Sequence, residues 1–237
     1  MTPMSKIPVS YKRHRFPREL IAHAVWLYFR FPLSFRLVEE MLLERGIVVS
    51  YETIRRWSLK FGAEYVRSLR RKRAKRDDIW HLDEVRVVIS GHIHWLWRAV
   101  DQDGYILDEI LQKRRNTKAA KRLLTRLLRK QGVRPRRMIT DKLSSYGAAK
   151  CELRLSVQHL SRKGLNNRAE NSHLPLRKRE RTMQRFRSPG GCQRLSTVFS
   201  AVRNFFVPPA ANANALSRHI HRLQAFAQWN TATILAA

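Results

Sequence analysis

The sequence predicts a mixed α/β domain, with helices flanking its sheet, that follows a small all-α domain. Two observations lead to this prediction. The first 65 residues carry apolar side chains at helical spacing, and from residue 79 the pattern changes to strands joined by short turns. The chain has 237 residues, of which 43% are hydrophobic. This apolar fraction can build a sizeable core, so the composition excludes a disordered protein.

The charge of the chain indicates a polyanionic partner. Its 48 Lys and Arg outweigh 18 Asp and Glu, which gives a formal net charge of +30. Nucleic acid is the first candidate for such a partner. Cys151 and Cys192 are too few for a disulfide framework or a four-cysteine zinc site, so we expect reduced thiols in the cytosol. We also expect no signal peptide and no membrane span.

Residues 1–65 are predicted to form three short helices. Pro17 suits the first position of a helix, and Ser34 and Ser50 suit the N-caps of the second and third. Three helices with tight turns favour a helix-turn-helix domain, although a plain helical bundle fits the same pattern. In the third helix, Ile54 and Trp57 would face inward, and a recognition helix would place its outward polar residues in the major groove. The candidate DNA contacts on that outward face are Arg55, Arg56 and Lys60.

A basic linker is predicted over residues 66–78. Residues 67–76 contain seven Lys or Arg and no acid. We interpret this run as a helix that contacts phosphates, with a solvated linker as the alternative.

The α/β core is predicted over residues 79–190, and it begins with a three-stranded meander. Turns at residues 90–91 and 101–104 separate its strands. The predicted strands are 79–89, 92–100, 105–111, 137–141 and 155–159, and the predicted helices are 117–130 and 144–150. Three antiparallel strands, a helix and an added strand match the order of the ribonuclease-H-like fold, the type found in retroviral integrases.

Three acids stand out in a chain that has few. Asp83 lies inside an apolar strand, Asp141 ends a later strand, and Glu170 lies near a helix start. A buried carboxylate is costly unless it is paired or binds a metal. An ion pair with one of the many basic residues is the structural alternative for Asp83. Glu84 is a rival acid, but we expect it on the opposite face of the strand.

The three acids lie in separate motifs, which are WHLDEV at residues 80–85, TDKLSSYG at 140–147 and NNRAENSH at 166–173. Together they resemble the DDE transposases of bacterial insertion sequences, and most of all the IS-six family. The resemblance covers roughly residues 15–205. Two departures are a short spacing, with 28 residues between Asp141 and Glu170, and Val85 where a threonine is frequent. The short spacing implies a trimmed loop before the last helix of the core.

The resemblance implies an enzyme that binds the terminal inverted repeats of an element, nicks DNA and joins the 3′-hydroxyl to target DNA. Asp83, Asp141 and Glu170 would be catalytic and would hold two Mg²⁺ ions, for which Mn²⁺ could substitute. A homo-oligomer on nucleoid DNA in the bacterial cytoplasm is implied as well. A nuclease without strand transfer and a non-catalytic DNA-binding regulator are the alternatives.

The helix that carries Glu170 would place cations beside the carboxylate. The family usually has a basic residue seven positions after the glutamate, and Arg177 stands there. Arg181 would share this stripe and also contact DNA, whereas Arg179 would lie on the other side of a continuous helix and tolerate substitution. Pro175 could instead break the helix, and the basic run could be a solvated face.

Two further features remain open from the sequence. Residues 191–237 are predicted to be a C-terminal helical segment that packs on the core or on another subunit. The pairs His92 with His94 and His219 with His221 are spaced for zinc, but no further ligands accompany them, so we expect none.

Overall fold

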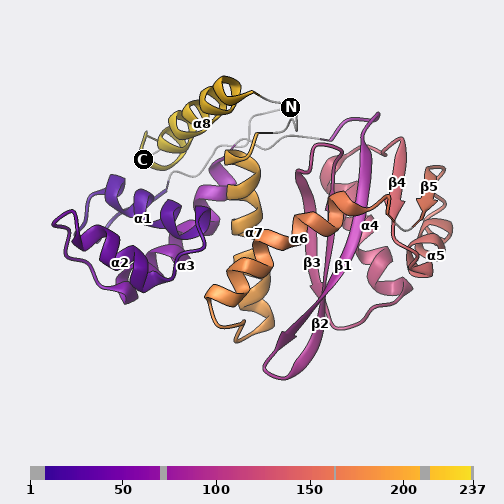
Figure 1. Cartoon of the computed structure of the whole chain (residues 1–237), viewed down its shortest axis with the longest axis horizontal. Coiled ribbons are helices and arrows are strands. Elements are labelled where there is room, and N and C mark those ends of the chain that lie inside the picture. Colours follow the sequence, from indigo (N-terminus) through magenta and orange to yellow (C-terminus); the bar gives the residue numbers. More distant parts are fainter. Residues whose placement is uncertain (1–8, 70–73, 163, 209–213, 236–237) are drawn as a thin grey trace. The chain divides into compact units, whose positions relative to one another are not determined.

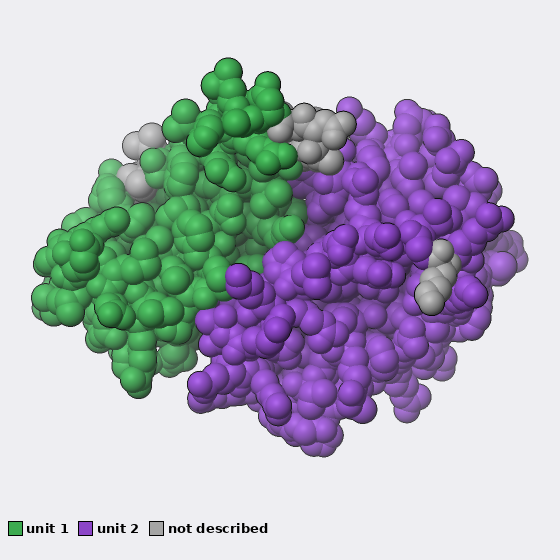
Figure 2. All heavy atoms as spheres, in the orientation of Figure 1, with its two compact units in different colours: residues 1–71, 198–208, 212–237 green, residues 72–197, 209–211 purple. Residues whose placement is uncertain are grey.

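The computed structural model describes residues 9–69, 74–162, 164–208 and 214–235. The chain divides into two compact units, shown in separate colours in Figure 2. The first contains residues 1–71, 198–208 and 212–237, and the second contains residues 72–197 and 209–211. Over the described ranges, no helix has the length and apolar character needed to cross a membrane.

The first unit begins with the three helices that the sequence predicts. Ser34 and Ser50 are N-caps, because their hydroxyls accept hydrogen bonds from the backbone N–H groups of Leu37 (3.2 Å) and Thr53 (3.3 Å). The inward residues of the third helix, Ile54 among them, are buried. The bounds of these helices are α1 (Arg18–Arg30), α2 (Phe35–Leu43) and α3 (Tyr51–Ser68).

The C-terminal helices complete the core of this first unit. They are α7 (Pro189–Phe206), whose residues from 198 on belong to this unit, α8 (Ala215–Asn230) and a short π-helix, η1 (Thr231–Leu235). The Trp229 ring meets Tyr65 of α3 with centroids 5.5 Å apart, and the Phe206 ring meets Trp26 of α1 at 5.9 Å. The segment therefore packs on the N-terminal helices of its own chain.

The second unit is built on a five-stranded mixed sheet. Its strand order is β3-β2-β1-β4-β5, in which β1 to β3 are antiparallel and β4 and β5 run parallel to β1. This is the ribonuclease-H-like order that the sequence predicts. The strands are β1 (Ile79–Ile89), β2 (His92–Val100), β3 (Ile106–Gln112), β4 (Arg137–Thr140) and β5 (Gln158–Ser161).

The last strand corrects one expectation. A strand over 155–159 was expected, but β5 begins at Gln158. Leu155 and Val157 are buried in the core beside the sheet, so their apolar character reflects packing in a loop and not strand pairing.

Helices cover both faces of the sheet. Trp80 and Leu82 of β1 pack into a core with the apolar side of α4 (Thr117–Gln131) and with α5 (Ser144–Glu152). The alternate residues of β1 face α6 (Asn167–Thr182), which crosses the sheet in Figure 1. Asp83 belongs to this second set.

A buried arginine anchors α6 to the sheet. Arg98 of β2 forms an ion pair with Glu109 of β3 (2.7 Å), and it donates to the backbone carbonyl of Ser172 in α6. Both side chains of the pair are almost fully buried. The helix is continuous through Pro175, so the alternative in which this proline breaks it is wrong.

A side chain closes the β3 edge of the sheet. Gln193 of α7 accepts a hydrogen bond from the backbone N–H of Leu111 (2.7 Å) and donates one to the backbone carbonyl of Glu109 (3.2 Å). Its amide therefore takes the place of a neighbouring strand along two residues of this edge.

Candidate active site

Asp83 and Asp141 lie side by side because of strand register. In the parallel pair, Leu82 of β1 is opposite Thr140, the last residue of β4. Asp83 and Asp141 are the next residues of the two strands, so their carboxylates meet where β4 ends. The backbone carbonyl of Asp141 accepts hydrogen bonds from the hydroxyls of Thr140 (2.8 Å) and Ser161 (2.7 Å), which fixes the chain at this point.

Glu84 joins these two acids. One oxygen from each of Asp83, Glu84 and Asp141 lies within 4.8 Å of the others. Glu84 and Asp83 bond to partners on different elements, as the alternation of side chains along β1 predicts. The pairing of β1 with β4 ends at Leu82, however, and beyond this residue the two carboxylates lie close to each other. Carboxylate oxygens are the hard ligands that suit Mg²⁺ or Mn²⁺.

The charged form of Asp83 is disfavoured in this cluster. Burial, followed by the neighbouring Asp141 carboxylate, raises the pKa of Asp83 to about 6. Its side chain is 13% exposed, and no lysine or arginine within the described ranges lies at ion-pair distance from it. The ion-pair explanation for a buried Asp83 therefore finds no partner in the part of the chain that the structure describes.

Glu84 is buried but well bonded. It accepts a hydrogen bond from the Tyr146 hydroxyl (2.9 Å), and it forms an ion pair with Arg115 (2.6 Å). Burial raises the pKa of Glu84 to about 7, and these two partners oppose the rise. Arg115 also lies 3.8 Å from Asp141 and stacks over the Trp95 ring at 5.0 Å. It therefore stands at the rim of the acidic cluster.

His173 of α6 faces the other side of Asp83. Its Nε2 atom lies 3.4 Å from Asp83 Oδ2. Burial, together with Arg98, lowers the pKa of His173 well below its usual value, so the ring is neutral near pH 7. The side-chain amide of Asn166 donates to the backbone carbonyl of Leu82 (2.7 Å), which ties the start of α6 to the residue before Asp83.

Glu170 lies outside the acidic cluster. It is exposed in the first turn of α6, three residues before His173. Residues three apart on a helix are neighbours on its surface, so Glu170 is one turn from the residue that touches Asp83. The structure thus brings Asp83, Asp141 and Glu84 together. Glu170 is not among them and lies one helical turn from His173, the residue that contacts Asp83.

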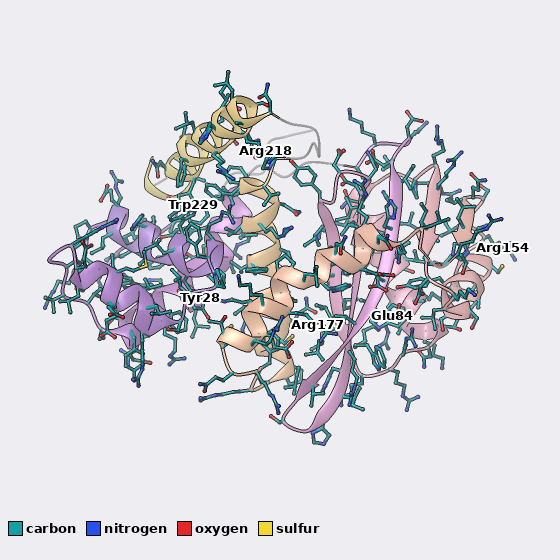
Figure 3. The ribbon with its side chains drawn as sticks, in the orientation of Figure 1. Tyr28, Glu84, Arg154, Arg177, Arg218 and Trp229 are labelled. Atoms are coloured by element: carbon teal, nitrogen blue, oxygen red, sulfur yellow. The ribbon has the colours of Figure 1, made fainter. Side chains whose placement is uncertain are left out.

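The cations of α6 divide into two classes. Arg177, labelled in Figure 3, and Arg181 are exposed, as their predicted role requires. Arg179 is fully buried. The expectation that Arg179 tolerates substitution is therefore wrong, because truncating this side chain would leave a cavity in the packed unit.

The outward face of α3 is formed as predicted. Arg55, Arg56 and Lys60 are exposed. Arg55 is bonded to Glu52 through two nitrogen–oxygen contacts of 2.7 and 2.8 Å. Arg56 is 3.5 Å from the same carboxylate, and 76% of its side chain is exposed. Arg56 is therefore the freer of the two guanidinium groups.

Other predicted features fall partly outside the described residues. The basic run at 67–76 includes residues 70–73, which lie outside them, and α3 extends into its first two positions. Cys151 and Cys192 are both free thiols.

Sequence reasoning missed three residues of the site, namely Arg115, Tyr146 and His173. His173 and Tyr146 stand inside the motifs that carry Glu170 and Asp141, so their positions in those motifs were the available signal. Arg115 is one of many cations in a basic loop, and only the folded chain singles it out.

The chain is similar to known proteins over most of its length. Residues 77–207 match a family described as a DDE domain. The chain is 31% identical over 182 residues to the transposase for insertion sequence-like element IS431mec of Staphylococcus aureus. It is 30% identical to the transposase for insertion sequence element IS257 in transposon Tn4003 of the same species. Each match covers 74% of this chain and 81% of the relative.

Solved structures of retroviral integrases are also similar. One is a simian T-cell lymphotropic virus intasome in complex with PP2A regulatory subunit B56 gamma. It is 17% identical with a TM-score of 0.44, and the match covers 64% of this chain and 56% of that one. Another is the HTLV-2 integrase catalytic core domain in complex with magnesium, which is 12% identical with a TM-score of 0.41. That match covers 63% of this chain and 99% of the core domain.

Proposed function

This chain belongs to the DDE transposases of bacterial insertion sequences, in the IS-six family, and from that membership we propose a specific reaction. The protein binds the ends of an insertion sequence and nicks the DNA by metal-assisted hydrolysis. It then joins the freed 3′-hydroxyl to target DNA. The reaction takes place on nucleoid DNA in the bacterial cytoplasm.

The observation that carries the proposal is the pairing of Asp83 with Asp141. Two carboxylates at the end of a parallel strand pair, one of them largely buried, repel each other. Such a pair of charged groups costs stability, and either a proton on one carboxylate or a cation close to both relieves the repulsion. The arrangement therefore favours binding of a divalent cation over a purely structural role.

The donor set fits magnesium. Asp83 and Asp141 would hold the metal, and Glu170 is the third ligand that the family motif assigns. Mn²⁺ would substitute, because it takes the same oxygen ligands. When bound, two such ions stabilise the attacking and leaving oxygens of an in-line displacement at phosphorus.

The protein's own groups prepare the site for this reaction. His173 is neutral beside Asp83, so it adds no positive charge that would compete with a cation for the carboxylate. Asn166 and Arg98 fix α6 to the sheet, and this helix carries both Glu170 and Arg177. Arg177 is two helical turns from Glu170 and would hold a phosphate of the DNA strand through paired N–H donors.

Recognition of the element end would fall to α3. Its exposed cations, above all Arg56, would enter the major groove, as in a helix-turn-helix. An insertion sequence has two ends, whereas the described part of the chain contains one acidic cluster of this kind. At least two copies of the chain would therefore assemble on the DNA.

A strand-transfer assay tests the proposal. Purified protein, a labelled element end and a target plasmid are incubated with Mg²⁺, and joined product is expected. Cleavage without joining would support a nuclease, and binding without cleavage would support a regulator. Ca²⁺ should support binding but little chemistry, because its larger and looser coordination positions the reacting oxygens poorly.

A further inference from the structure

The outer face of α4 carries charge of one sign only. This helix has six Lys or Arg and no acid. Lys118, Arg122, Arg126 and Lys130 follow each other at intervals of four residues, so they form a continuous ladder of like charges. Like charges at this spacing destabilise a helix, whereas an ordinary solvated face alternates charges of opposite sign.

Acids of the second unit neutralise only half of these cations. Asp108, a buried residue of β3, pairs with Arg126 (2.7 Å) and Lys130 (2.6 Å). Glu152 pairs with Lys121 (2.8 Å). Among the residues that the structure describes, no acid lies within ion-pair distance of the other three cations. These three are Lys118, Arg122 and Arg129.

The same cations line a shallow groove that is open to solvent. Ile110 of β3 and Thr125 of α4 complete its lining. Because Asp108 holds Arg126 and Lys130, two of the cations are fixed in position and are not free to swing into solvent. The fold therefore fixes part of this shallow cationic groove in place.

The size and place of the groove suit duplex DNA. Twelve residues separate Lys118 from Lys130, which corresponds to about 18 Å along a helix. This length matches about five base pairs at 3.4 Å each. Lys118 also follows Arg115, at the rim of the acidic cluster, by three residues, so one end of the groove lies close to the candidate active site.

We propose that the α4 groove binds the sugar–phosphate backbone of duplex DNA without regard to sequence. Arginine and lysine on a regular stripe are typical of phosphate contacts, which position a duplex and do not read its bases. A second copy of this chain is a poor occupant, since 18 acids against 48 basic residues cannot supply a matching acidic surface. The proposal concerns binding alone and needs no metal, so it can fail independently of the proposed reaction.

A pair of triple variants with equal loss of charge tests the groove. The groove variant combines Lys118→Ala, Arg122→Ala and Arg129→Ala. The control variant combines Arg134→Ala, Arg136→Ala and Arg154→Ala, three exposed cations of the same unit that do not line the groove. Affinity for a random 60-base-pair duplex is measured without divalent metal over a range of salt concentrations.

The groove variant should lose at least about tenfold in affinity at low salt. The slope of log affinity against log salt should become shallower by about 2.7, because each phosphate contact contributes about 0.9. The control variant should change that slope by less than about one. Equal changes in both variants, or an unchanged slope in the groove variant, would overturn the proposal. Arg122→Gln alone, with an expected change of about 0.9, provides the test if the triple variant folds poorly.

Two arms of the experiment distinguish the sources of the DNA. If the groove holds the flank of the bound element end, the groove variant should bind long end duplexes less tightly and short ones normally. If it holds a separate duplex, end binding should be normal and only the complex with a second duplex should be lost. Polyglutamate and unlabelled DNA are compared as competitors at equal total charge. If polyglutamate displaces the bound duplex as well as DNA does, the groove is better suited to an acidic protein, which counts against the proposal.

Discussion

Asp83 and Glu84 are neighbours in β1, yet their surroundings differ. Glu84 has a guanidinium and a phenol as bonded partners, whereas Asp83 faces a neutral histidine and a second carboxylate. Both are buried and both have a raised pKa. Burial alone therefore does not distinguish the two acids, and their bonded partners do. An acid that has no cationic partner among the described residues and faces another acid is suited to bind a cation, which is the role proposed for Asp83.

The largest expected effect is a difference in catalytic activity between variants of Asp83 and variants of Glu84. Asp83→Asn, Asp141→Asn and Glu170→Gln should each reduce nicking and joining by more than about 10²-fold, because each removes a proposed metal ligand. End binding should persist, since the proposed recognition residues lie on α3. Glu84→Gln should retain activity within about tenfold, because the amide oxygen can still accept from Arg115 while the amide NH2 donates to the Tyr146 hydroxyl oxygen. Equal loss in Glu84→Gln would make Glu84 a ligand, and wild-type rates in Glu170→Gln would remove Glu170 from the site.

The second prediction uses the pH dependence of stability in metal-free protein. The folded pKa of Asp83 is about 6, above its unfolded value, so the folded state binds the proton more tightly. The contribution of Asp83 to stability is therefore greatest below about pH 4 and falls as pH rises to about 6, by about 2–3 kcal/mol. Asp83→Asn should remove this contribution, whereas the separate fall that comes from Glu84, whose pKa is raised to about 7, should remain.

Urea unfolding in EDTA at several pH values measures the difference between wild type and Asp83→Asn. Above pH 6, Mg²⁺ should restore stability to the wild type and not to the variant, because binding to the folded state stabilises it. If Mg²⁺ changes the free energy of unfolding of the wild type no more than that of the variant, the proposal that Asp83 binds a cation is contradicted.

The third prediction concerns the partner of Glu84. Arg115→Ala should lower the free energy of unfolding by about 1–3 kcal/mol, because it leaves a buried carboxylate with one partner fewer. Adding Glu84→Gln should recover part of this loss, since the amide carries no charge. Denaturant unfolding of the two single variants and the double variant gives the coupling energy. Additive losses would mean that the contact between Arg115 and Glu84 contributes little.

A fourth, smaller effect is expected on α6. Arg177→Ala should reduce joining by about tenfold while end binding persists, and Arg177→Lys should recover only part of the loss, because an ammonium cannot form two parallel bonds. Lys178→Ala is the matched control, because Lys178 is also exposed but lies on another side of the helix. Joining yield and mobility-shift affinity are measured for each. Equal sensitivity at 177 and 178 would indicate diffuse phosphate binding along the helix.

The smallest expected effect extends the comparison to the first unit. Arg55 is bonded to Glu52, whereas Arg56 is largely exposed. Arg56→Ala should therefore reduce discrimination between the element end and random DNA more than Arg55→Ala, by about 1 kcal/mol, the low end of the value of a bidentate base contact. Competition binding with both DNAs measures it. If both variants weaken all DNA equally, these residues contact phosphates.

Much of this architecture could be predicted from the sequence, because local signals specify it. Ser34 and Ser50 cap helices through contacts three residues away, and the bounds of β1 and β2 follow from hairpin turns. Asp83 stands out because an acid inside an apolar strand is costly, and Asp141 stands out because it ends a strand within a second motif of the family resemblance. These features depend on near neighbours in the chain.

Other features could not be predicted from the sequence, because they depend on residues that are far apart in the chain. Arg115 is 31 residues from Glu84, and nothing local distinguishes it from Lys113 or Arg114. The burial of Arg179 and the packing of Trp229 against Tyr65 are likewise set by tertiary contacts. Helical periodicity shows that one face of a segment is apolar, but it does not show which element covers that face.

The Gln193 contact with β3 has a consequence for how copies of the chain can assemble. An open edge strand is a template on which another chain can add a strand, which leads to uncontrolled association. Here an incoming strand would first have to displace the Gln193 amide from Leu111 and Glu109. Extension of the sheet from one molecule to the next is thus opposed at these two residues of the edge. If copies of the chain assemble on DNA, as proposed, we expect them to associate through surfaces other than this part of β3.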